Sequence, residues 1–267
     1  FDDNESQMII NHGVRGSIPN PSKNTLGFGG NTSCVEVKTS KYQLIFDAGS
    51  GFSKVDFSND LQTILFLSHF HHDHIQGLAF NSYNSDINKK IILTSAHSNS
   101  KDTYNNLTNY FKNPYFPVDF IEIIGKFEFI EFEKVVNIFQ DLEINSIELN
   151  HPGNCSGYSI TSEEKKFCYL LDNEYESNQK KELIEFCNFS DTIIWDGMFL
   201  DKELPDKKGW GHSSVEQGID LANEIEFKKF LISHHSPTRE DNEIKQIQNN
   251  LSNIKIKFAS ENEVIDF

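Results

Sequence analysis

The chain has 267 residues, 37% of them apolar, which predicts a folded protein with a substantial core and excludes a disordered one. Its formal net charge is −16 with few clustered lysines or arginines, so a long nucleic acid is not an expected partner. No apolar run is long enough to span a membrane and the acidic start lacks the features of a signal peptide, so a cytoplasmic protein without membrane contact is expected.

Strand and loop signals alternate in the first half of the chain. Short runs rich in Val, Ile, Leu and Phe predict strands at 8–11, 34–37, 43–47, 64–68 and 91–94. A stretch rich in Gly, Pro, Asn and Ser at 13–31 predicts a long loop, and loops of this length often carry function. A helix is expected near 101–111, and the alternation from 118 to 147 indicates a meander of strands.

The second half alternates buried strands with helices. Apolar runs predict strands at 167–171, 192–195, 230–233 and 254–258. Ser213 is a good N-cap for a helix that runs to about 225, and another helix is expected near 241–251. Because the chain shows no repeat and no linker, we expect one α/β domain with layered sheets, spanning residues 1–267. The four scattered cysteines are expected to be buried free thiols.

The densest group of metal-type side chains lies at residues 69–74, which read His-Phe-His-His-Asp-His directly after an apolar strand. Alternate residues His69 and His71 can face one metal ion, and Asp73 and His74, beyond the turn, can face a second. Imidazole and carboxylate suit Zn²⁺ and also Fe or Mn. The alternative is a solvated histidine-rich loop, which five such side chains in six residues disfavour.

Further candidate residues stand at strand ends or in glycine-rich turns. Taken singly, each would more often be a structural residue, but their shared placement favours one common site. They are His151, Asp172, Asp196, His212, His234 and His235.

The residues named so far resemble the metallo-β-lactamase fold superfamily, whose His-x-His-x-Asp-His motif corresponds to residues 69–74. This resemblance implies a four-layer αββα sandwich with two metal ions at one edge of its sheets. It also implies that Asp47 supports the metal ligands from behind. The implied metal ligands are His69, His71, Asp73, His74, His151, Asp172 as the bridging carboxylate, and His234 rather than His235.

Two further segments are similar to the phosphodiesterase branch of that superfamily, which includes tRNase Z, the phosphodiesterase of the carbon–phosphorus lyase pathway and cyclic-nucleotide phosphodiesterase-like proteins. The first combines Arg15-Gly16-Ser17 with Gly30-Asn31-Thr32-Ser33, and the second is Gly211-His212-Ser213-Ser214. A β-lactam substrate is disfavoured, because members that cleave β-lactams typically lack a histidine at the position of His74.

The resemblance implies a mechanism built on two divalent metal ions, with Zn²⁺ expected and Mn or Fe able to fit. The ions would hold a hydroxide between them as the nucleophile, because a bound metal lowers the pKa of water toward ~7. Asp73 would orient this nucleophile, and His212 would protonate the leaving alkoxide. The alternative for His212 is a buried histidine at the start of the following helix.

The chain has only two arginines, Arg15 and Arg239, against 22 lysines, and both lie in loops predicted to flank the site. A guanidinium binds phosphate in a two-pronged way, so one or both are expected to contact the substrate. Alternatively, Arg239 pairs with Glu240 or Asp241 at a helix start. The aromatic residues between 80 and 120 predict either a lid that stacks on a base or ordinary core packing.

These observations together predict a dinuclear metal-dependent hydrolase. The expected activity is that of a phosphodiesterase acting on a small anionic substrate such as a cyclic nucleotide. The alternatives are a thioester or lactone hydrolase on the same metal core, a di-iron redox protein, and a binding module without turnover. A homodimer is expected by analogy with the branch.

Overall fold

The computed structural model describes residues 7–81, 89–120 and 124–267. Its first sheet has seven strands in the order β13-β1-β2-β3-β4-β5-β6. Pairing is antiparallel from β13 to β3 and parallel from β3 to β6. The strands are β1 (Met8–Gly13), β2 (Cys34–Lys38), β3 (Tyr42–Phe46), β4 (Gln62–Leu67), β5 (Ile91–Ser95), β6 (Phe127–Phe129) and β13 (Val264–Asp266).

The second sheet has six strands in the order β12-β11-β10-β9-β8-β7. Its strands β9 to β12 are parallel, and β7, β8 and β9 are antiparallel. The strands are β7 (Glu143–Leu149), β8 (Cys155–Ser162), β9 (Lys165–Leu170), β10 (Ser190–Asp196), β11 (Phe227–Ser233) and β12 (Ile256–Phe258).

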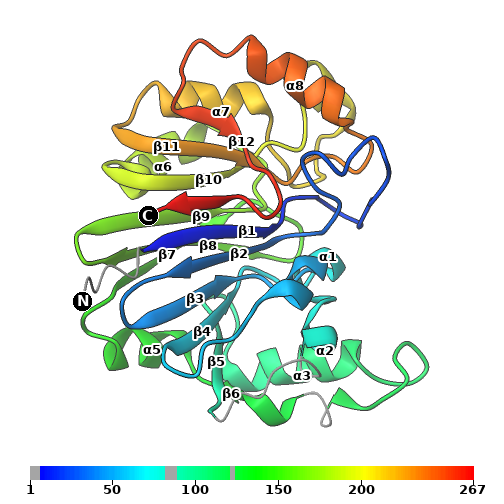
Figure 1. Cartoon of the computed structure of the whole chain (residues 1–267), viewed down its shortest axis with the longest axis vertical. Helices are drawn as coiled ribbons and strands as arrows, with labels where there is room; N and C mark the ends of the chain where they lie inside the picture. Colours follow the sequence, from blue (N-terminus) through cyan, green and yellow to red (C-terminus); the bar gives the residue numbers. More distant parts are fainter. Residues whose placement is uncertain (1–6, 82–88, 121–123) are drawn as a thin grey trace, which may run out of the picture.

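Short helices connect the strands and cover the sheets. In Figure 1, α7 and α8 lie at the top of the molecule and α2 and α3 at the bottom. Among the described residues, no helix has the length and apolarity needed to cross a membrane. The α-helices are α1 (His72–Ile75), α2 (Leu78–Asn81), α3 (Ser100–Tyr110), α5 (Phe132–Ile138), α6 (Lys180–Cys187), α7 (Val215–Ala222) and α8 (Asp241–Asn249). The 3₁₀ helices are η1 (Ser50–Lys54), η2 (Ile124–Lys126), η3 (Ser177–Gln179) and η4 (Asp201–Asp206).

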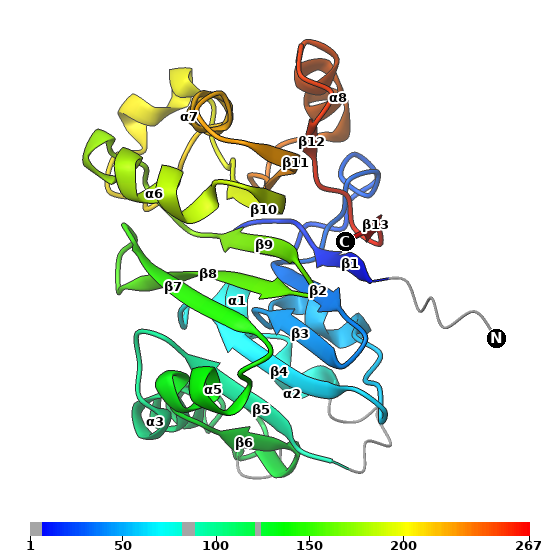
Figure 2. The ribbon, with the colours of Figure 1, turned by 90° about the vertical axis from the view of Figure 1, so that its left-hand side faces the viewer.

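Three apolar cores separate four layers. The central core lies between the sheets, where Phe46 of β3 packs against the rings of Phe66, Tyr158, Phe167 and Tyr169. One outer core lies under α6, α7 and α8, and the other under η1, α2 and α3 (Figure 2). The predicted αββα sandwich is therefore confirmed, with the expected apolar strand runs at its centre.

The parallel strands of both sheets end at one common edge. In such sheets, ligand sites form beyond the carboxyl ends of the strands. The predicted site residues follow this rule: they come after β3 (Asp47), β4 (His69 to His74), β9 (Asp172) and β11 (His234), and at the end of β10 (Asp196).

The region 118–147 is not the predicted meander of strands. It contains β6, which pairs with β5, then α5, and then β7, which joins the other sheet. In α5, Phe132 and Val135 are buried three residues apart, which is a helical spacing that the alternation of the surrounding residues hides. Residues 121–123 of this region lie outside the described residues.

Two smaller predictions also differ from the structure. The N-cap of α7 is Ser214, whose side chain accepts a hydrogen bond from the Gln217 N–H at 3.0 Å, whereas the Ser213 hydroxyl donates to the Asn173 carbonyl. Strand β8 was not expected, because its Ser- and Gly-rich sequence lacks the apolar signal of a strand buried on both faces. The cysteines are buried free thiols, as expected.

Candidate metal centre

The first group of ligand-type side chains joins the two sheets. His69 and His71 follow β4, and His151 comes from the turn between β7 and β8. Their ligand atoms lie within 4.8 Å of one another. The His71 Nδ1 and His151 Nε2 atoms are 2.9 Å apart. Three imidazoles converging in this way match the nitrogen ligands that Zn²⁺ and related ions prefer.

The second group contains Asp73, His74, Asp172 and His234, again with ligand atoms within 4.8 Å of one another. His74 Nε2 lies 3.4 Å from Asp73 Oδ2 and 3.2 Å from Asp172 Oδ2. His234 Nε2 lies 3.2 Å from the other oxygen of Asp172, Oδ1. All four side chains are buried.

Asp172 stands between the two groups. Its Oδ2 atom is 3.7 Å from His69 Nε2 and 3.6 Å from His151 Nε2, in addition to its contacts with the second group. A carboxylate with ligands on both sides can bridge two cations. The structure thus brings together all seven residues for which the sequence predicts metal binding.

Several buried polar atoms at this point have no hydrogen-bond partner in the described part of the chain. They are His69 Nε2, His74 Nε2, His234 Nε2 and Asp172 Oδ1. Buried polar atoms are nearly always satisfied, so a cluster of unpaired ones that face each other needs an explanation. The donor set fits two divalent metal ions, which would bind these four atoms.

The opposite nitrogen of each of these histidines, and that of His151, is held by the protein. Such hydrogen bonds fix the tautomer and the ring direction of a ligand. The sequence analysis foresaw only one of the partners, Asp47. The pairs are His74 Nδ1 with Asp47 Oδ2 at 2.6 Å, His69 Nδ1 with Ser68 Oγ at 2.9 Å, His234 Nδ1 with Ser33 Oγ at 3.0 Å, and His151 Nδ1 with the Gly211 carbonyl at 2.7 Å.

The electrostatics of the cluster also suit a cation. Burial lowers the pKa of His69 and of His151, which keeps both rings neutral and able to bind metal. Burial opposes a charge on His74, but the carboxylates of Asp172 and Asp73 outweigh it and raise its pKa. Burial likewise works to raise the pKa of Asp172, but the rings of His234 and His74 outweigh it and lower that pKa. Without metal, a proton therefore sits where a cation would bind, and metal binding would displace it.

The structure distinguishes His234 from His235. His235 Nε2 donates to the Ala259 carbonyl at 2.8 Å, and burial lowers its pKa to about 3, whereas His234 points into the cluster. His234 and Asp47 both adopt left-handed backbone conformations, with φ of 59° and 61°. Such conformations cost free energy outside glycine and gather at functional sites.

His212 lies beside the cluster and is oriented by Asp196, the residue that ends β10. Its Nδ1 atom is 2.8 Å from Asp196 Oδ2 and 3.9 Å from Asp172 Oδ2. Its ring stacks on that of His234, with centroids 5.0 Å apart. Burial opposes the charged ring, but Asp196 and then Asp172 raise the pKa of His212 to about 9. The sequence marked Asp196 as a strand end but gave no sign of its pairing with His212.

The two arginines lie in loops next to the site, as expected, but their side chains contact other parts of the protein. Arg15 is fully buried and donates to the carbonyls of Gly29, Thr25, Ser236 and Arg239. Its guanidinium therefore holds loops together and has no free edge for a phosphate.

Arg239 is also buried, and both terminal nitrogens of its guanidinium are engaged. It pairs with Glu203 and Glu243 and donates to the Met198 carbonyl, so its expected partners Glu240 and Asp241 are not its partners here. These contacts do not support the prediction that the two arginines bind substrate, because a planar group with five donors serves buried carbonyls and carboxylates as well as phosphates.

The aromatic residues between 80 and 120 divide into two sets, with Tyr83 outside the described residues. Phe111 is buried in the core under α3, while Phe80 and Tyr115 are exposed. Phe80 and Tyr115 line a cavity of about 740 Å³ together with His72 and Gln76, and Phe111 also lines it. None of the seven expected metal ligands lines this cavity, although His72 lies between His71 and Asp73 in the sequence.

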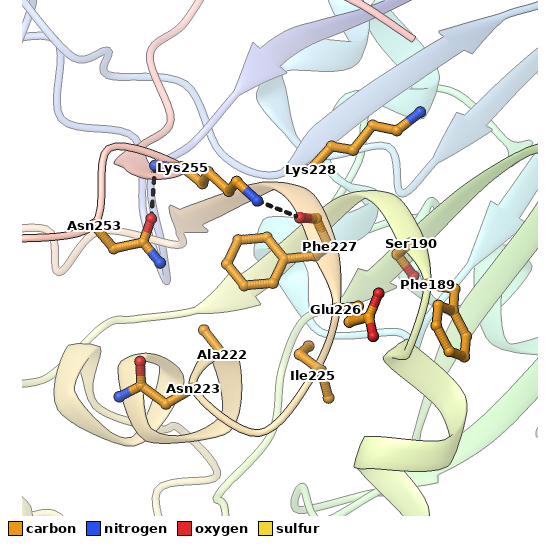
Figure 3. A pocket seen from close by; sticks show the side chains of 10 residues that line it. All are labelled: Phe189, Ser190, Ala222, Asn223, Ile225, Glu226, Phe227, Lys228, Asn253 and Lys255. Carbon is orange, nitrogen blue, oxygen red and sulfur yellow. Dashed lines mark hydrogen bonds between the residues drawn. The ribbon is translucent and has the colours of Figure 1, made fainter.

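Another cavity, of about 540 Å³, lies at the opposite ends of β10 and β11 (Figure 3). Ser190 and Phe227, the first residues of these strands, line it, whereas Asp196 and His234 stand at or beyond the last ones. Because the cavity and the metal cluster lie at opposite ends of these strands, the cavity is not part of the candidate metal site.

The comparison with protein families agrees with this geometry. Residues 45–235, which carry all seven expected ligands, match the model of the beta-lactamase superfamily domain. The chain belongs to this superfamily. It is also 31% identical over 84 residues to ribonuclease Z of Treponema denticola, a match that covers 30% of this chain and 25% of that relative.

Solved structures of the superfamily share the fold over the whole chain. The metallo-beta-lactamase fold protein YhfI from Bacillus subtilis aligns with a TM-score of 0.71 and 18% identity, covering 98% of this chain and 100% of the other. The short form of human tRNase Z aligns with a TM-score of 0.64 and 18% identity, covering 97% and 98%. At these identities the similarity to solved structures establishes the fold. The family predicted from the motif is confirmed by the match of residues 45–235 to the family model.

Proposed function

We propose that this protein is a metal-dependent phosphodiesterase that works with two divalent metal ions. The observation that carries the proposal is the convergence on the Asp172 carboxylate of the buried Nε2 atoms of His69, His74 and His234, which have no hydrogen-bond partner among the described residues. The similarity of 84 residues of the chain to ribonuclease Z supports phosphodiester chemistry over the hydrolysis of other esters.

The ligands divide into two sets that share one carboxylate. Bound at these sites, two ions such as Zn²⁺ would supply Lewis acidity for the phosphoryl oxygens and lower the pKa of water. The first set is His69, His71 and His151, to which we add Asp172 because it lies near His69 and His151, and the second is Asp73, His74, Asp172 and His234.

Two side chains of the protein would handle protons and orientation. The Ser17 N–H donates to Asp73 Oδ2 at 2.8 Å, which fixes this carboxylate in a position to accept a hydrogen bond from the attacking water. The Nδ1 atom of His212 faces Asp196, which leaves Nε2 to donate a proton to the leaving oxygen. We therefore assign Asp73 an orienting role and His212 the role of general acid.

The proposed substrate is a small phosphodiester such as a cyclic nucleotide. A net charge of −16 repels a polyanion, which disfavours long RNA, while a compact anion can be held by the metal ions themselves. A precursor tRNA remains a necessary member of the test panel, because ribonuclease Z is a relative.

The test is hydrolysis by the purified protein, stripped of metal and reloaded with Zn²⁺ or Mn²⁺. The panel contains bis-p-nitrophenyl phosphate, cyclic nucleotides and a precursor tRNA, with His69→Ala as the matched control. Metal-dependent cleavage of the small diesters that His69→Ala abolishes is expected. Two bound ions per chain without cleavage of any phosphodiester would refute the proposal and direct attention to thioesters and lactones.

A further inference from the structure

The two tryptophans of the chain differ in their surroundings. Trp195 is fully buried, whereas 56% of Trp210 is exposed. Trp210 belongs to the segment Lys207-Lys208-Gly209-Trp210-Gly211, which we call the Trp210 loop and which leads directly into His212. Such exposure of a large indole ring beside a candidate active site indicates a contact surface.

The Trp210 loop is fixed to the metal centre. The Gly211 carbonyl accepts the hydrogen bond that orients His151, at 2.7 Å. A Cβ atom on Gly211 would lie 2.1 Å from His151 Nδ1, so only glycine permits this approach. The carboxylate of Glu174 accepts from the N–H groups of Gly209 and Gly211 at 2.8 and 2.9 Å. Trp210 therefore stands on a positioned loop, one residue from a contact with a metal ligand.

The ring of Trp210 is supported by its neighbours. The Lys207 ammonium lies 4.0 Å from the ring centroid, which is a cation–π contact. Phe199 makes edge contacts with Trp210 and with His212, at centroid distances of 6.4 and 5.9 Å. A row of rings thus leads from the exposed indole to the proposed general acid.

Positive charge accompanies the exposed ring. Lys207 and Lys208 of the same loop line a cavity of about 360 Å³ together with His212, a volume within the range of small-ligand pockets of ~300–1,000 Å³, while Trp210 is not among its lining residues. In the described part of the chain, neither lysine forms an ion pair. The acidic side chains of that cavity are engaged elsewhere: Glu174 with the loop, Glu176 in capping η3, and Asp201 with the Ser214 hydroxyl.

We propose that the Trp210 loop is the subsite that recognises the nucleoside part of the substrate. Trp210 stacks on a planar base, and Lys207 and Lys208 attract the phosphate charge of the same ligand. The inference rests on the proposed function and narrows its substrate class to phosphodiesters that carry a nucleobase. The larger aromatic cavity does not compete for this role, because neither His212 nor any of the seven expected ligands lines it.

The first test uses the tryptophan itself as the reporter of binding. Because Trp195 is buried, quenching of the solvent-exposed emission by a ligand reports on Trp210. The metal-loaded protein is titrated with adenosine monophosphate and, as the match without a base, with ribose 5-phosphate. Saturable quenching by the first ligand alone is expected, and Trp210→Phe should lose it.

The second test separates base recognition from phosphodiester chemistry. Two substrates share a p-nitrophenyl leaving group: the p-nitrophenyl ester of thymidine 5′-monophosphate and methyl p-nitrophenyl phosphate. Stacking on one base contributes ~1–3 kcal/mol, so Trp210→Ala should raise KM for the thymidine ester about 5- to 150-fold. Its KM for the methyl ester and its metal content should stay unchanged. Phe189→Ala, which removes another exposed ring at the far ends of the strands (Figure 3), is the matched control.

The outcomes distinguish the two proposals. Equal quenching by both ligands, or an equal effect of Trp210→Ala on both esters, would overturn the nucleoside subsite and leave the phosphodiesterase intact. Suppose that the wild-type protein cleaves neither ester, but that adenosine monophosphate quenches Trp210 emission and ribose 5-phosphate does not. The proposed activity would then be refuted, while the nucleoside subsite would be retained.

Discussion

Asp47 illustrates how one side chain organises the candidate centre without meeting a metal ion. Its Oδ1 accepts from the Ser68 N–H at 2.7 Å, and its Oδ2 accepts from the Ser68 hydroxyl and the Tyr169 hydroxyl and pairs with His74 Nδ1. These partners include the residue before His69 and the ring of His74 itself. The carboxylate therefore sets the direction of two proposed ligands at once.

Asp47→Asn should weaken metal binding about 10- to 100-fold, the usual effect of losing such a supporting partner. The NH₂ group of the asparagine would face hydrogen-bond donors that the carboxylate oxygen accepts from, so at least one of the hydrogen bonds to residue Asp47 would be lost. Metal affinity measured by competition with a chelator tests this, with Asp60→Asn, an exposed aspartate, as the control. An unchanged affinity would show that His74 is oriented without Asp47.

His212→Gln should separate proton transfer from metal binding. Glutamine can still hydrogen bond to Asp196 but cannot release a proton, so kcat for a diester with an alkoxide leaving group should fall ~10²–10⁴-fold. A p-nitrophenolate leaves without protonation, so its release should fall much less. His97→Gln, outside the site, is the control. Equal losses on both substrates would contradict the general-acid role.

At the scale of elements, Arg15 decides how the long loop at 13–31 is held. Its guanidinium is buried and donates to Gly29, Thr25 and two carbonyls of the segment between β11 and α8. Arg15→Met should lower the free energy of unfolding by ~2–5 kcal/mol, because each buried carbonyl left unpaired costs ~1–3 kcal/mol. Urea denaturation measures the loss, with exposed Lys23→Met as the control. A raised KM at unchanged stability would instead restore the substrate role.

Strand β2 carries a buried acid whose titration affects stability. Glu36 pairs with His12 at 2.6 Å and accepts from Gln43, also at 2.6 Å. Burial works to raise the pKa of Glu36, but the hydrogen bond and charge of His12 outweigh it and lower that pKa below its ordinary value of 4.5. Because the folded pKa is the lower one, this contribution is present above pH 4.5 and is lost as the pH falls through the folded value.

Glu36→Gln should therefore reduce the stability of the protein at neutral pH by ~1–3 kcal/mol and reduce its loss of stability below pH 4.5. Unfolding is followed by circular dichroism from pH 7 to 3 in the presence of a chelator, so that release of metal does not contribute. Glu148→Gln, an exposed acid on β7, is the control. Parallel pH profiles of Glu36→Gln and the wild type would rule out this linkage.

The sequence predicted the candidate site well where the residue types involved have few structural roles. The motif at 69–74 follows an apolar strand, so both its chemistry and its position at a sheet edge could be predicted. Partners such as Ser33, Ser68 and the Gly211 carbonyl could not, because serine and backbone groups carry no distinctive signal and meet the histidines only through tertiary contacts. The arginines misled for a related reason: a guanidinium serves buried carbonyls as well as phosphates.

For the whole molecule, the metal ions would join the two sheets. Each group of ligands takes members from the segment that follows β4 of the first sheet and from segments next to β7, β9 or β11 of the second. Folding creates this convergence, and an unfolded chain lacks it. Metal binding must therefore stabilise the folded state by mass action.

Removing the metal with a chelator should lower Tm, and restoring it should recover the loss. One site at a free metal concentration of 100 times its Kd adds ~2.7 kcal/mol. For a chain near this size, 1 kcal/mol shifts Tm by ~2–4 °C, so a shift of roughly 5–10 °C per site is expected. Scanning calorimetry with and without Zn²⁺ measures it, and His69→Ala should lose part of the shift because it removes a ligand of one group alone. If the Tm of the wild-type protein is the same with and without Zn²⁺, the ions do not connect the two sheets.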